Sequence, residues 1–251
     1  MTAPSTSWPY PRWIAHRGAG KLAPENTMSA FRLGAAHGWR MFECDAKLSR
    51  DGVPFLLHDA TLERTTNGQG QGSDLSLGEI AQLDAGSWHS RAYAGEAVPT
   101  LEALARWCLA NHFFLNVEIK PTPGQEAETG RVVAELMARI WPRDAVQPFF
   151  SSFKPAALQA AKEAAPHIPR GLLVDKLAEG DADFQTAQDL GCVAMVFNHA
   201  LWDAERVAQV HGLGMRCLSY TVNDEWAVQR LLDLGTDGII SDRVDLFSPA
   251  A

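Results

Sequence analysis

Residues 41–59 have the sequence MFECDAKLSRDGVPFLLHD. Its first part, Met41–Leu48, is an apolar run of strand length with polar residues at intervals. The turn signal Arg50-Asp51-Gly52 then leads into a second short run, Val53–His58, which predicts that the strand folds back as a hairpin. A helical pattern precedes the first run, at Asn26–His37. This part of the sequence therefore predicts a helix, a strand and a hairpin, in that order.

The same alternation of short strands and longer amphipathic helices extends along the chain. The predicted strands are Trp13–Gly18, Met41–Leu48, Phe113–Lys120, Val146–Ser152, Arg170–Val174, Cys192–Asn198, Met215–Val222 and Gly238–Ser241. The predicted helices are Asn26–His37, Leu101–Asn111, Glu126–Trp141, Pro155–Ala165, Asp183–Leu190, Asp203–Gly212 and Asp224–Leu234. Strands and helices in this order form parallel βα units. We therefore predict an α/β protein, a (β/α)8 TIM barrel, with an open doubly wound sheet as the alternative.

Length and charge limit the fold and the partners. The chain has 251 residues, and barrels of this class use about 250 residues in one domain. Residues 1–251 are therefore predicted to form a single domain. With 30 acidic and 22 basic residues the net charge is -8, which argues against nucleic acid as a partner. A small anionic substrate needs only a few local positive charges.

Cysteine spacing and hydropathy predict a cytoplasmic protein. Cys44, Cys108, Cys192 and Cys217 lie far apart and form no CxxC pair, which is typical of buried thiols in a reducing compartment. The first 13 residues, MTAPSTSWPYPRW, lack the pattern of a secretion signal. We find no apolar run long enough for a membrane span, and we expect no stable membrane association.

The segment at residues 59–98 interrupts the alternation after the second strand. It is polar and rich in glycine, as in the sequence RTTNGQGQGSD at residues 64–74, with one short helical piece near Leu77–Leu83. A connection of this length inside a compact domain is usually functional. We therefore predict that it is an insertion in the barrel.

Acidic residues at two predicted strands suggest a metal site. Glu43 and Asp45 are two residues apart, so both side chains lie on one face of the strand. Glu118 comes near the end of the next barrel strand, with Lys120 on its own face. Oxygen ligands favour Mg2+ or Ca2+, with Mn2+ as a further candidate. The alternatives are a surface-facing edge strand for the first pair and a simple salt bridge between Glu118 and Lys120.

The hairpin brings a histidine toward this site. If Asp51-Gly52 is a two-residue turn, Arg50 pairs with Val53, and counting outward places Asp45 opposite His58. Directly opposed residues have Cβ atoms about 4.5–5.5 Å apart. A bulge would shift this pairing by one residue.

Another histidine and two cations complete the set of candidate groups. The first strand ends in His16 and Arg17, and the third carries Lys120. Histidine transfers protons near neutral pH, while Arg17, Lys120 and a divalent cation suit a phosphoryl group. Cleavage of a phosphodiester therefore fits better than acyl transfer, and the sequence has no GxSxG, P-loop or GxGxxG motif.

A succession of short motifs resembles the glycerophosphodiester phosphodiesterase family. The matching blocks are His16-Arg-Gly, Pro24-Glu-Asn-Thr27, Glu43-Cys-Asp45, Leu48-Ser-Arg-Asp-Gly52, Leu57-His-Asp59, Arg64-Thr-Thr-Asn-Gly68, Asn116-Val-Glu-Ile-Lys-Pro121, Ser151-Ser-Phe153, Tyr220-Thr-Val-Asn223 and Asp237-Gly-Ile-Ile-Ser-Asp242. Two further blocks, Asp84-Ala-Gly-Ser-Trp88 and Ala164-Ala-Pro-His-Ile-Pro-Arg-Gly171, are similar to the cytoplasmic bacterial branch. Each block alone is weakly specific, whereas their order along nearly the whole chain is highly specific.

The resemblance implies a barrel with an insertion after its second strand that hydrolyses glycerophosphodiesters to sn-glycerol 3-phosphate and an alcohol. It implies an acid/base pair, three metal ligands and two phosphate contacts. These are His16 and His58, then Glu43, Asp45 and Glu118, then Arg17 and Lys120. Glu25 either orients Arg17 or belongs to a helix start beside an N-cap at Asn26.

Other functions remain as alternatives at this point. A phospholipase D-like or cyclising lipase on the same barrel would need an exposed apolar rim, and the loops are mostly polar. A non-catalytic binder of phosphate ligands would not need the two histidines. The sequence leaves the headgroup, the choice of cation and the oligomeric state open.

Overall fold

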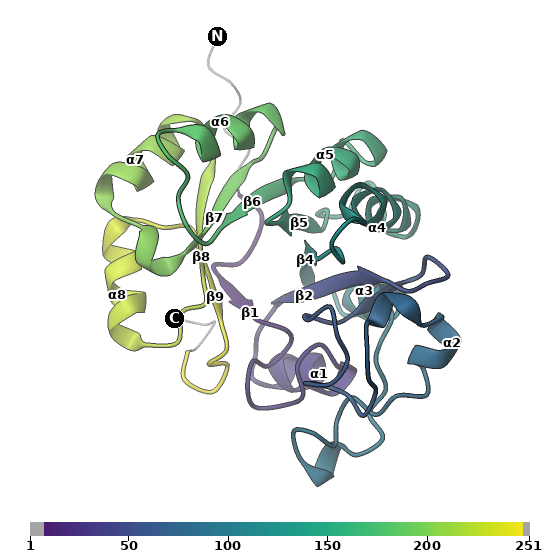
Figure 1. Cartoon of the computed structure of the whole chain (residues 1–251). Coiled ribbons are helices and arrows are strands. Elements are labelled where there is room, and N and C mark those ends of the chain that lie inside the picture. Colours follow the sequence, from purple (N-terminus) through teal and green to yellow (C-terminus); the bar gives the residue numbers. More distant parts are fainter. Residues whose placement is uncertain (1–7, 248–251) are drawn as a thin grey trace.

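A parallel sheet closes on itself because its first strand has a partner on each side. Strand β1 (Trp13–Ala15) pairs in parallel with β2 (Met41–Leu48) and with β9 (Gly238–Ser241), the last strand of the chain. In the computed structural model, which describes residues 8–247, this closure produces the predicted (β/α)8 barrel and excludes the open sheet (Figure 1). The residues at both ends of the predicted domain, 1–7 and 248–251, lie outside the described residues, and so does much of the segment that was searched for a secretion signal.

The remaining elements follow the predicted order with small differences at their ends. The other parallel strands are β4 (Phe114–Ile119), β5 (Phe149–Ser152), β6 (Arg170–Val174), β7 (Ala194–Asn198) and β8 (Arg216–Tyr220). The helices around the barrel are α1 (Met28–Ala36), α3 (Leu101–Ala110), α4 (Glu126–Ile140), α5 (Pro155–Ala164), α6 (Ala182–Asp189), α7 (Ala204–Gly212) and α8 (Glu225–Leu234). The first predicted strand was too long at its end. It stops at Ala15 because Arg17 and Gly18 have φ of 51° and 100°, which an extended strand cannot contain.

Side chains on β2 alternate between two environments. Phe42, Cys44 and Ala46 pack outward in the large apolar core between the barrel and its helices. Met41 points the other way, into a smaller apolar cluster inside the barrel. Because side chains alternate along a strand, Glu43 and Asp45 share the inward face of Met41. The barrel interior is therefore apolar where β2 begins and acidic where β2 ends.

The hairpin after β2 differs from the predicted register by one residue. Strand β3 (Pro54–Leu56) pairs antiparallel to β2 with Leu48 opposite Pro54, so that Asp45 lies opposite Leu57 rather than His58. The turn contains three residues, because the Ser49 N–H donates to the Val53 carbonyl and Gly52 has a φ of 74°. This is the type I turn with a bulge that glycine permits. His58 follows the end of β3 and is positioned by a bend in the chain.

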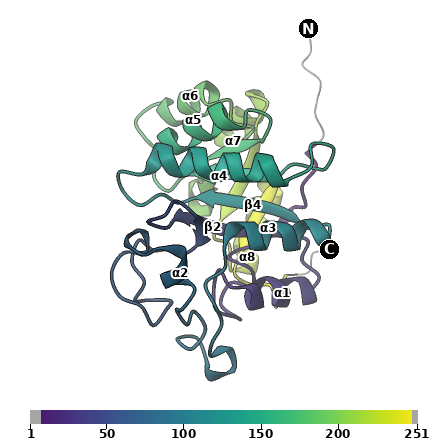
Figure 2. The same cartoon turned by 90° about the vertical axis from the view of Figure 1, so that its right-hand side faces the viewer.

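The segment between β3 and α3 has a small core of its own. Two 3-10 helices, η1 (Gly72–Asp74) and η2 (Arg91–Tyr93), and the short helix α2 (Leu77–Ile80) interrupt its loops. Phe55, Leu57, Leu62, Ile80, Ala85 and Val98 bury one another there. The loops around α2 project from the lower part of the molecule in both views (Figures 1 and 2). Phe55 belongs to β3, so this core is anchored on the hairpin beside the barrel mouth.

None of the helices within residues 8–247 has both the length and the apolar composition that a bilayer crossing requires.

Gly34 in α1 is required by the close approach of the loop after β1. A Cβ atom at this position would lie 2.2 Å from the Gly18 carbonyl oxygen, so the loop that carries His16 and Arg17 would have to move. We expect Gly34→Ala to lower the free energy of unfolding by about 1–3 kcal/mol, although alanine is the better helix former.

Gly212→Ala is the matched control, because Gly212 lies in helix α7 with open space around its Cβ position. This variant should be neutral or slightly stabilised. Urea unfolding of both variants measures the difference, and equal effects would contradict the role of the close contact.

Candidate active site

The carboxylates of Glu43, Asp45 and Glu118 converge at the barrel mouth. Asp45 on β2 is aligned with Glu118 on β4, and Glu43 lies one inward position earlier on β2. One carboxylate oxygen from each residue lies within 4.8 Å of the others. The three residues are 2%, 0% and 8% exposed, which excludes the surface-facing alternative.

Burial makes this arrangement of like charges costly. Burial and the neighbouring charges of Asp45 and Glu118 raise the pKa of Glu43 well above its ordinary value. Burial and Asp45 likewise raise the pKa of Glu118, against the opposing effect of Lys120. Burial acts on Asp45 too, but Arg17 and Lys120 outweigh it and hold the pKa of Asp45 well below its ordinary value. The protein by itself therefore stabilises only part of the negative charge.

Two oxygens of the cluster lack a hydrogen bond and fit a hard divalent cation. Glu43 Oε1 and Asp45 Oδ1 are buried and accept no hydrogen bond from the described residues. Buried acceptors normally have partners, and oxygen-only ligand sets are those that Mg2+, Ca2+ and Mn2+ prefer. A dication would both satisfy these atoms and offset the repulsion among the carboxylates.

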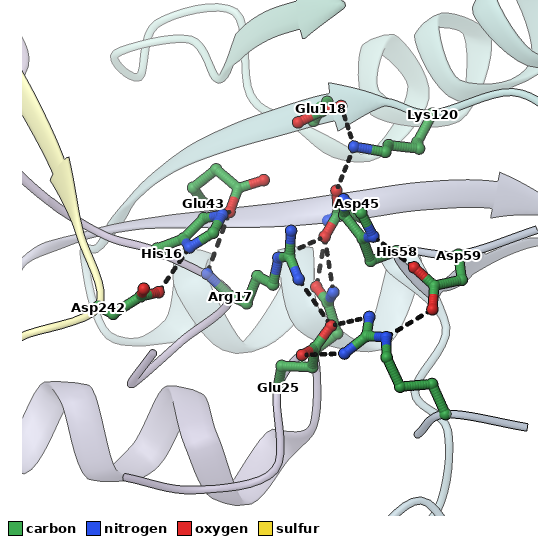
Figure 3. A network of polar contacts seen from close by, with 12 residues as sticks. His16, Arg17, Glu25, Glu43, Asp45, His58, Asp59, Glu118, Lys120 and Asp242 are labelled. Carbon is green, nitrogen blue, oxygen red and sulfur yellow. Dashed lines mark hydrogen bonds and ion pairs between the residues drawn. The ribbon is translucent and has the colours of Figure 1, made fainter. Parts of the chain in front are cut away.

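His16 lies beside Glu43 and is oriented from behind by Asp242 (Figure 3). Its Nδ1 lies 2.6 Å from Asp242 Oδ1, and its Nε2 lies 3.8 Å from Glu43 Oε2. Asp242 also accepts a hydrogen bond from Asn223 Nδ2 at 2.8 Å. Burial opposes ionisation of Asp242, but the hydrogen bonds of His16 and Asn223 keep its pKa below the ordinary value. An ionised Asp242 directs the Nδ1 proton toward itself and leaves Nε2 facing the carboxylates.

His58 has the same arrangement on the other side of Asp45 (Figure 3). Its Nδ1 lies 2.7 Å from Asp59 Oδ1, and Asp59 accepts a hydrogen bond from Arg64 Nε at 2.5 Å. Burial lowers the pKa of His58, although Asp45 and Asp59 favour the protonated ring. The structure thus presents two imidazoles with carboxylates on their Nδ1 atoms at the edges of one acidic cluster.

Arg17 connects these groups into a continuous polar network. Its backbone N–H donates to Glu43 Oε2 at 3.0 Å, and its Nε lies 3.1 Å from Asp45 Oδ2. Its Nη1 donates to Glu25 Oε1 at 2.8 Å. Arg64 donates to both oxygens of the same Glu25 at 2.8 Å each, which joins the segment after β3 to the barrel.

Two lysines lie next to the cluster at the ends of β2 and β4. Lys120 Nζ donates to Glu118 Oε1 at 2.7 Å and lies 3.5 Å from Asp45 Oδ1. The simple salt bridge between Lys120 and Glu118 is therefore present, as part of a larger cluster. Lys47 shares the inward face of Asp45 and is 2% exposed, and its Nζ donates to the Lys120 carbonyl oxygen at 3.0 Å. Burial lowers the pKa of Lys47 to about 8.

All seven predicted site residues meet at this mouth, while several of their partners were not predicted. The partners without a predicted role are Asp59, Arg64 and Asp242. All three lie in motif blocks that resemble the family, which was the signal that could have found them. Asp59 also directly follows His58, whereas Asp242 comes from the opposite end of the chain. The prediction of Asn26 as an N-cap was wrong, because Thr27 caps α1 by accepting from the Ala30 N–H.

Asn26 instead holds Asp45 in position. Its Nδ2 donates to Asp45 Oδ2 at 2.8 Å, and its Oδ1 accepts from the Asp45 N–H at 3.1 Å. Asn26 has a φ of 58°, a conformation that asparagine tolerates better than most residues. Glu25, next to it, orients Arg17, the first of the two alternatives considered for this residue.

Comparison with known proteins identifies the family. The model of the glycerophosphoryl diester phosphodiesterase family matches residues 16–246. A glycerophosphodiester phosphodiesterase of Caldanaerobacter subterraneus subsp. tengcongensis is 33% identical over 234 residues, which cover 91% of this chain and 93% of that protein.

Solved structures agree with this result. An Oleispira antarctica phosphodiesterase, in complex with the product sn-glycerol-3-phosphate, has a TM-score of 0.87 and 36% identity over 92% of this chain and 93% of that one. A glycerophosphodiester phosphodiesterase from Agrobacterium tumefaciens has a TM-score of 0.75 and 29% identity over 96% and 100% of the two chains.

The contacts of Asn26 predict a measurable effect on stability. We expect Asn26→Gly, which keeps the left-handed backbone, to lose about 1–3 kcal/mol through the two missing hydrogen bonds. Asn26→Ala should lose about 1–2 kcal/mol more, because alanine disfavours this φ. Urea denaturation of the two variants and the wild type measures both differences. Wild-type stability in the glycine variant would show that the side-chain contacts with Asp45 contribute nothing.

Proposed function

Because this chain belongs to the glycerophosphoryl diester phosphodiesterase family, we propose that it hydrolyses glycerophosphodiesters to sn-glycerol 3-phosphate and an alcohol. Membership makes the chain a phosphoric diester hydrolase. The observation that carries the proposal is the buried triad of Glu43, Asp45 and Glu118 between two carboxylate-paired histidines. The product bound to the Oleispira antarctica phosphodiesterase supports a small glycerol phosphate ligand.

In this proposal Glu43, Asp45 and Glu118 hold one divalent cation, either Mg2+ or Ca2+, with Mn2+ as the further candidate. A bound dication would supply positive charge to the phosphoryl oxygens, where negative charge accumulates during cleavage. Arg17 and Lys120 bind the same oxygens from the sides. Both cations already contact Asp45, so the site positions its positive charges before the substrate arrives.

The two histidines would transfer the protons. His16 would accept the proton of the nucleophile at Nε2, since Asp242 fixes the other ring nitrogen. His58 would donate a proton from Nε2 to the oxygen of the departing alcohol, and Asp59 would keep the ring oriented. Burial lowers the pKa of His58, which makes its protonated form a stronger acid toward the leaving alkoxide.

The nucleophile is either water or the 2-hydroxyl group of the glycerol. In the second route the 2-hydroxyl attacks phosphorus and the alcohol leaves, which gives a cyclic phosphate that water then opens. Rapid-quench sampling separates the two routes, because only the second accumulates a cyclic glycerophosphate.

Two further features belong to the same proposal. We infer that residues 59–98 are the insertion that the family resemblance implies, since their small core supports the loop that carries His58 and Asp59. We also propose a cytoplasmic location, supported by four cysteines that are all free and buried. The resemblance to the cytoplasmic bacterial branch stays a prediction from the sequence.

Chelation tests the metal. The chelated protein should lose turnover of glycerophosphocholine, and at least one of Mg2+, Ca2+ and Mn2+ should restore it. The added cation should also raise the melting temperature, and more at about pH 8 than at about pH 5.

The direction of this pH dependence follows from the raised pKa values of Glu43 and Glu118. The unfolded chain releases these protons at a lower pH than the folded protein, so in that window rising pH destabilises the metal-free protein. A dication would bind the deprotonated carboxylates of the folded protein, so rising pH would then stabilise the protein that contains the cation. Glu43→Gln should reduce the cation-dependent rise, and a melting temperature insensitive to all three ions would refute the metal site.

A leaving-group comparison tests the role of His58. His58→Ala should lose about 10²–10⁴-fold in kcat on glycerophosphocholine, whose alkoxide needs a proton. The loss should be far smaller on an aryl diester, whose phenolate leaves without one. His37→Ala, at an exposed helix end, is the control and should match the wild type on both substrates. Equal losses on the two substrates would rule out His58 as the acid.

A further inference from the structure

A pocket adjoins the proposed catalytic centre on the side of His58. It has a volume of about 210 Å³ and lies between the segment after β3 and the ends of β4 and β5. Its wall includes His58, Glu118, Phe153 and three lysines, Lys47, Lys120 and Lys154.

The position of this pocket assigns it to the alcohol. His58 contributes to the wall and is the proposed acid for the leaving oxygen, whereas His16 and Arg17 do not contribute. The bond that breaks joins phosphorus to the oxygen that His58 protonates, and this oxygen leaves with the alcohol, so the carbon atoms of the alcohol extend past His58. This step depends on the proposed function.

The pocket wall carries more positive than negative charge. Lys120 is neutralised by Glu118 and Asp45. Lys47 donates to one backbone carbonyl and forms no ion pair with any residue in the range 8–247. Lys154 is exposed at the rim and likewise forms no ion pair with a carboxylate in the described part of the chain.

The carboxylates near Lys47 are already engaged. Asp45 contacts Arg17 and Lys120, and Asp59 contacts His58 and Arg64. Lys47 is 2% exposed, so little solvent screens its charge. A buried ammonium group that uses one of three possible hydrogen bonds is a ready partner for an anion.

The aromatic group of the pocket does not favour a cationic alcohol. Lys120 Nζ lies 5.5 Å from the centroid of the Phe153 ring. The ring centroids of Phe153 and Tyr220 lie 5.7 Å apart, in a T-shaped arrangement. A quaternary ammonium group over the same ring would meet the charge of Lys120. Choline therefore gains little from this pocket.

We propose that this pocket is a subsite for an acidic group on the alcohol, with Lys47 and Lys154 as specificity-determining residues. The preferred substrates are glycerophosphodiesters whose alcohol bears a carboxylate or a phosphate. The enzyme discriminates against alcohols with a quaternary ammonium group.

Matched diesters test the proposal. Glycerophosphoglycerate carries a carboxylate where glycerophosphoglycerol has a hydroxymethyl group, and bis(glycerophospho)glycerol carries a second glycerophosphoryl group, with its anionic phosphate, on the alcohol. We expect kcat/KM for either acidic diester to exceed that for glycerophosphoglycerol by about tenfold, and that for glycerophosphocholine by more. The part of the preference that exposed Lys154 contributes should weaken between about 0.01 M and about 1 M salt, over which the Debye length falls from about 30 Å to about 3 Å, while the part from buried Lys47 should persist.

Lysine variants locate the preference in this pocket. Lys154→Gln should lower the ratio of acidic to neutral kcat/KM by about threefold or more, and Lys47→Gln should lower it further. Lys162→Gln removes the same charge from helix α5 at a distance from the pocket wall and should leave the ratio unchanged. Circular dichroism checks the fold of Lys47→Gln, and Lys154→Gln at the rim tests the subsite if that variant unfolds.

The possible outcomes separate this proposal from the proposed function. Equal kcat/KM for acidic and neutral diesters in the wild type, or an unchanged ratio in Lys154→Gln, would overturn the subsite while diester hydrolysis stands. If none of the diesters is hydrolysed, the proposed function fails. Calorimetric titration with glycerate then decides the subsite, which requires weaker binding by Lys154→Gln than by Lys162→Gln and the wild type.

Discussion

Repulsion among three buried carboxylates is the constraint on which the barrel mouth depends. One carboxylate oxygen from each of Glu43, Asp45 and Glu118 lies within 4.8 Å of the others, and the three residues are at most 8% exposed. Such a cluster persists in a folded protein only when cations or donors surround it. Arg17, Lys120 and Asn26 supply part of that support, and all three act on Asp45. The uneven support explains why Asp45 stays ionised while Glu43 and Glu118 hold their protons more tightly.

A second layer of contacts connects side chains from distant segments at the mouth. Each histidine has a carboxylate behind it, and the chain of contacts from Asp59 through Arg64 and Glu25 reaches Arg17. A charged hydrogen bond weakens steeply when its distance or angle departs from the preferred value, so these links favour one arrangement of the side chains. The arrangement also leaves Lys47 and Lys154 without an ion pair to any carboxylate within residues 8–247, and both line the pocket on the proposed alcohol side of the mouth.

Local patterns predicted the elements of this fold well, because strand and helix periods depend on neighbouring residues. The convergence of Glu43, Asp45 and Glu118 followed from the rule that parallel strands present their ends on one side. The register of His58 was missed because the conformation of Gly52 decides between a two-residue and a three-residue turn. Asp242 was missed as a partner of His16 because 226 residues separate them and only barrel closure brings them together. Asn26 was misassigned because a helix start and a carboxylate contact favour the same residue type.

The contact between the first and last strands has a consequence for synthesis on the ribosome. His16, Glu43, Asp45, His58 and Glu118 are all translated within the first half of the chain. The residue that fixes the tautomer of His16 emerges only with β9, the strand that closes the barrel. A nascent chain therefore contains both proposed proton carriers and all three acidic ligands long before it can use them. The barrel can close, and Asp242 can contact His16, only after β9 has been synthesised.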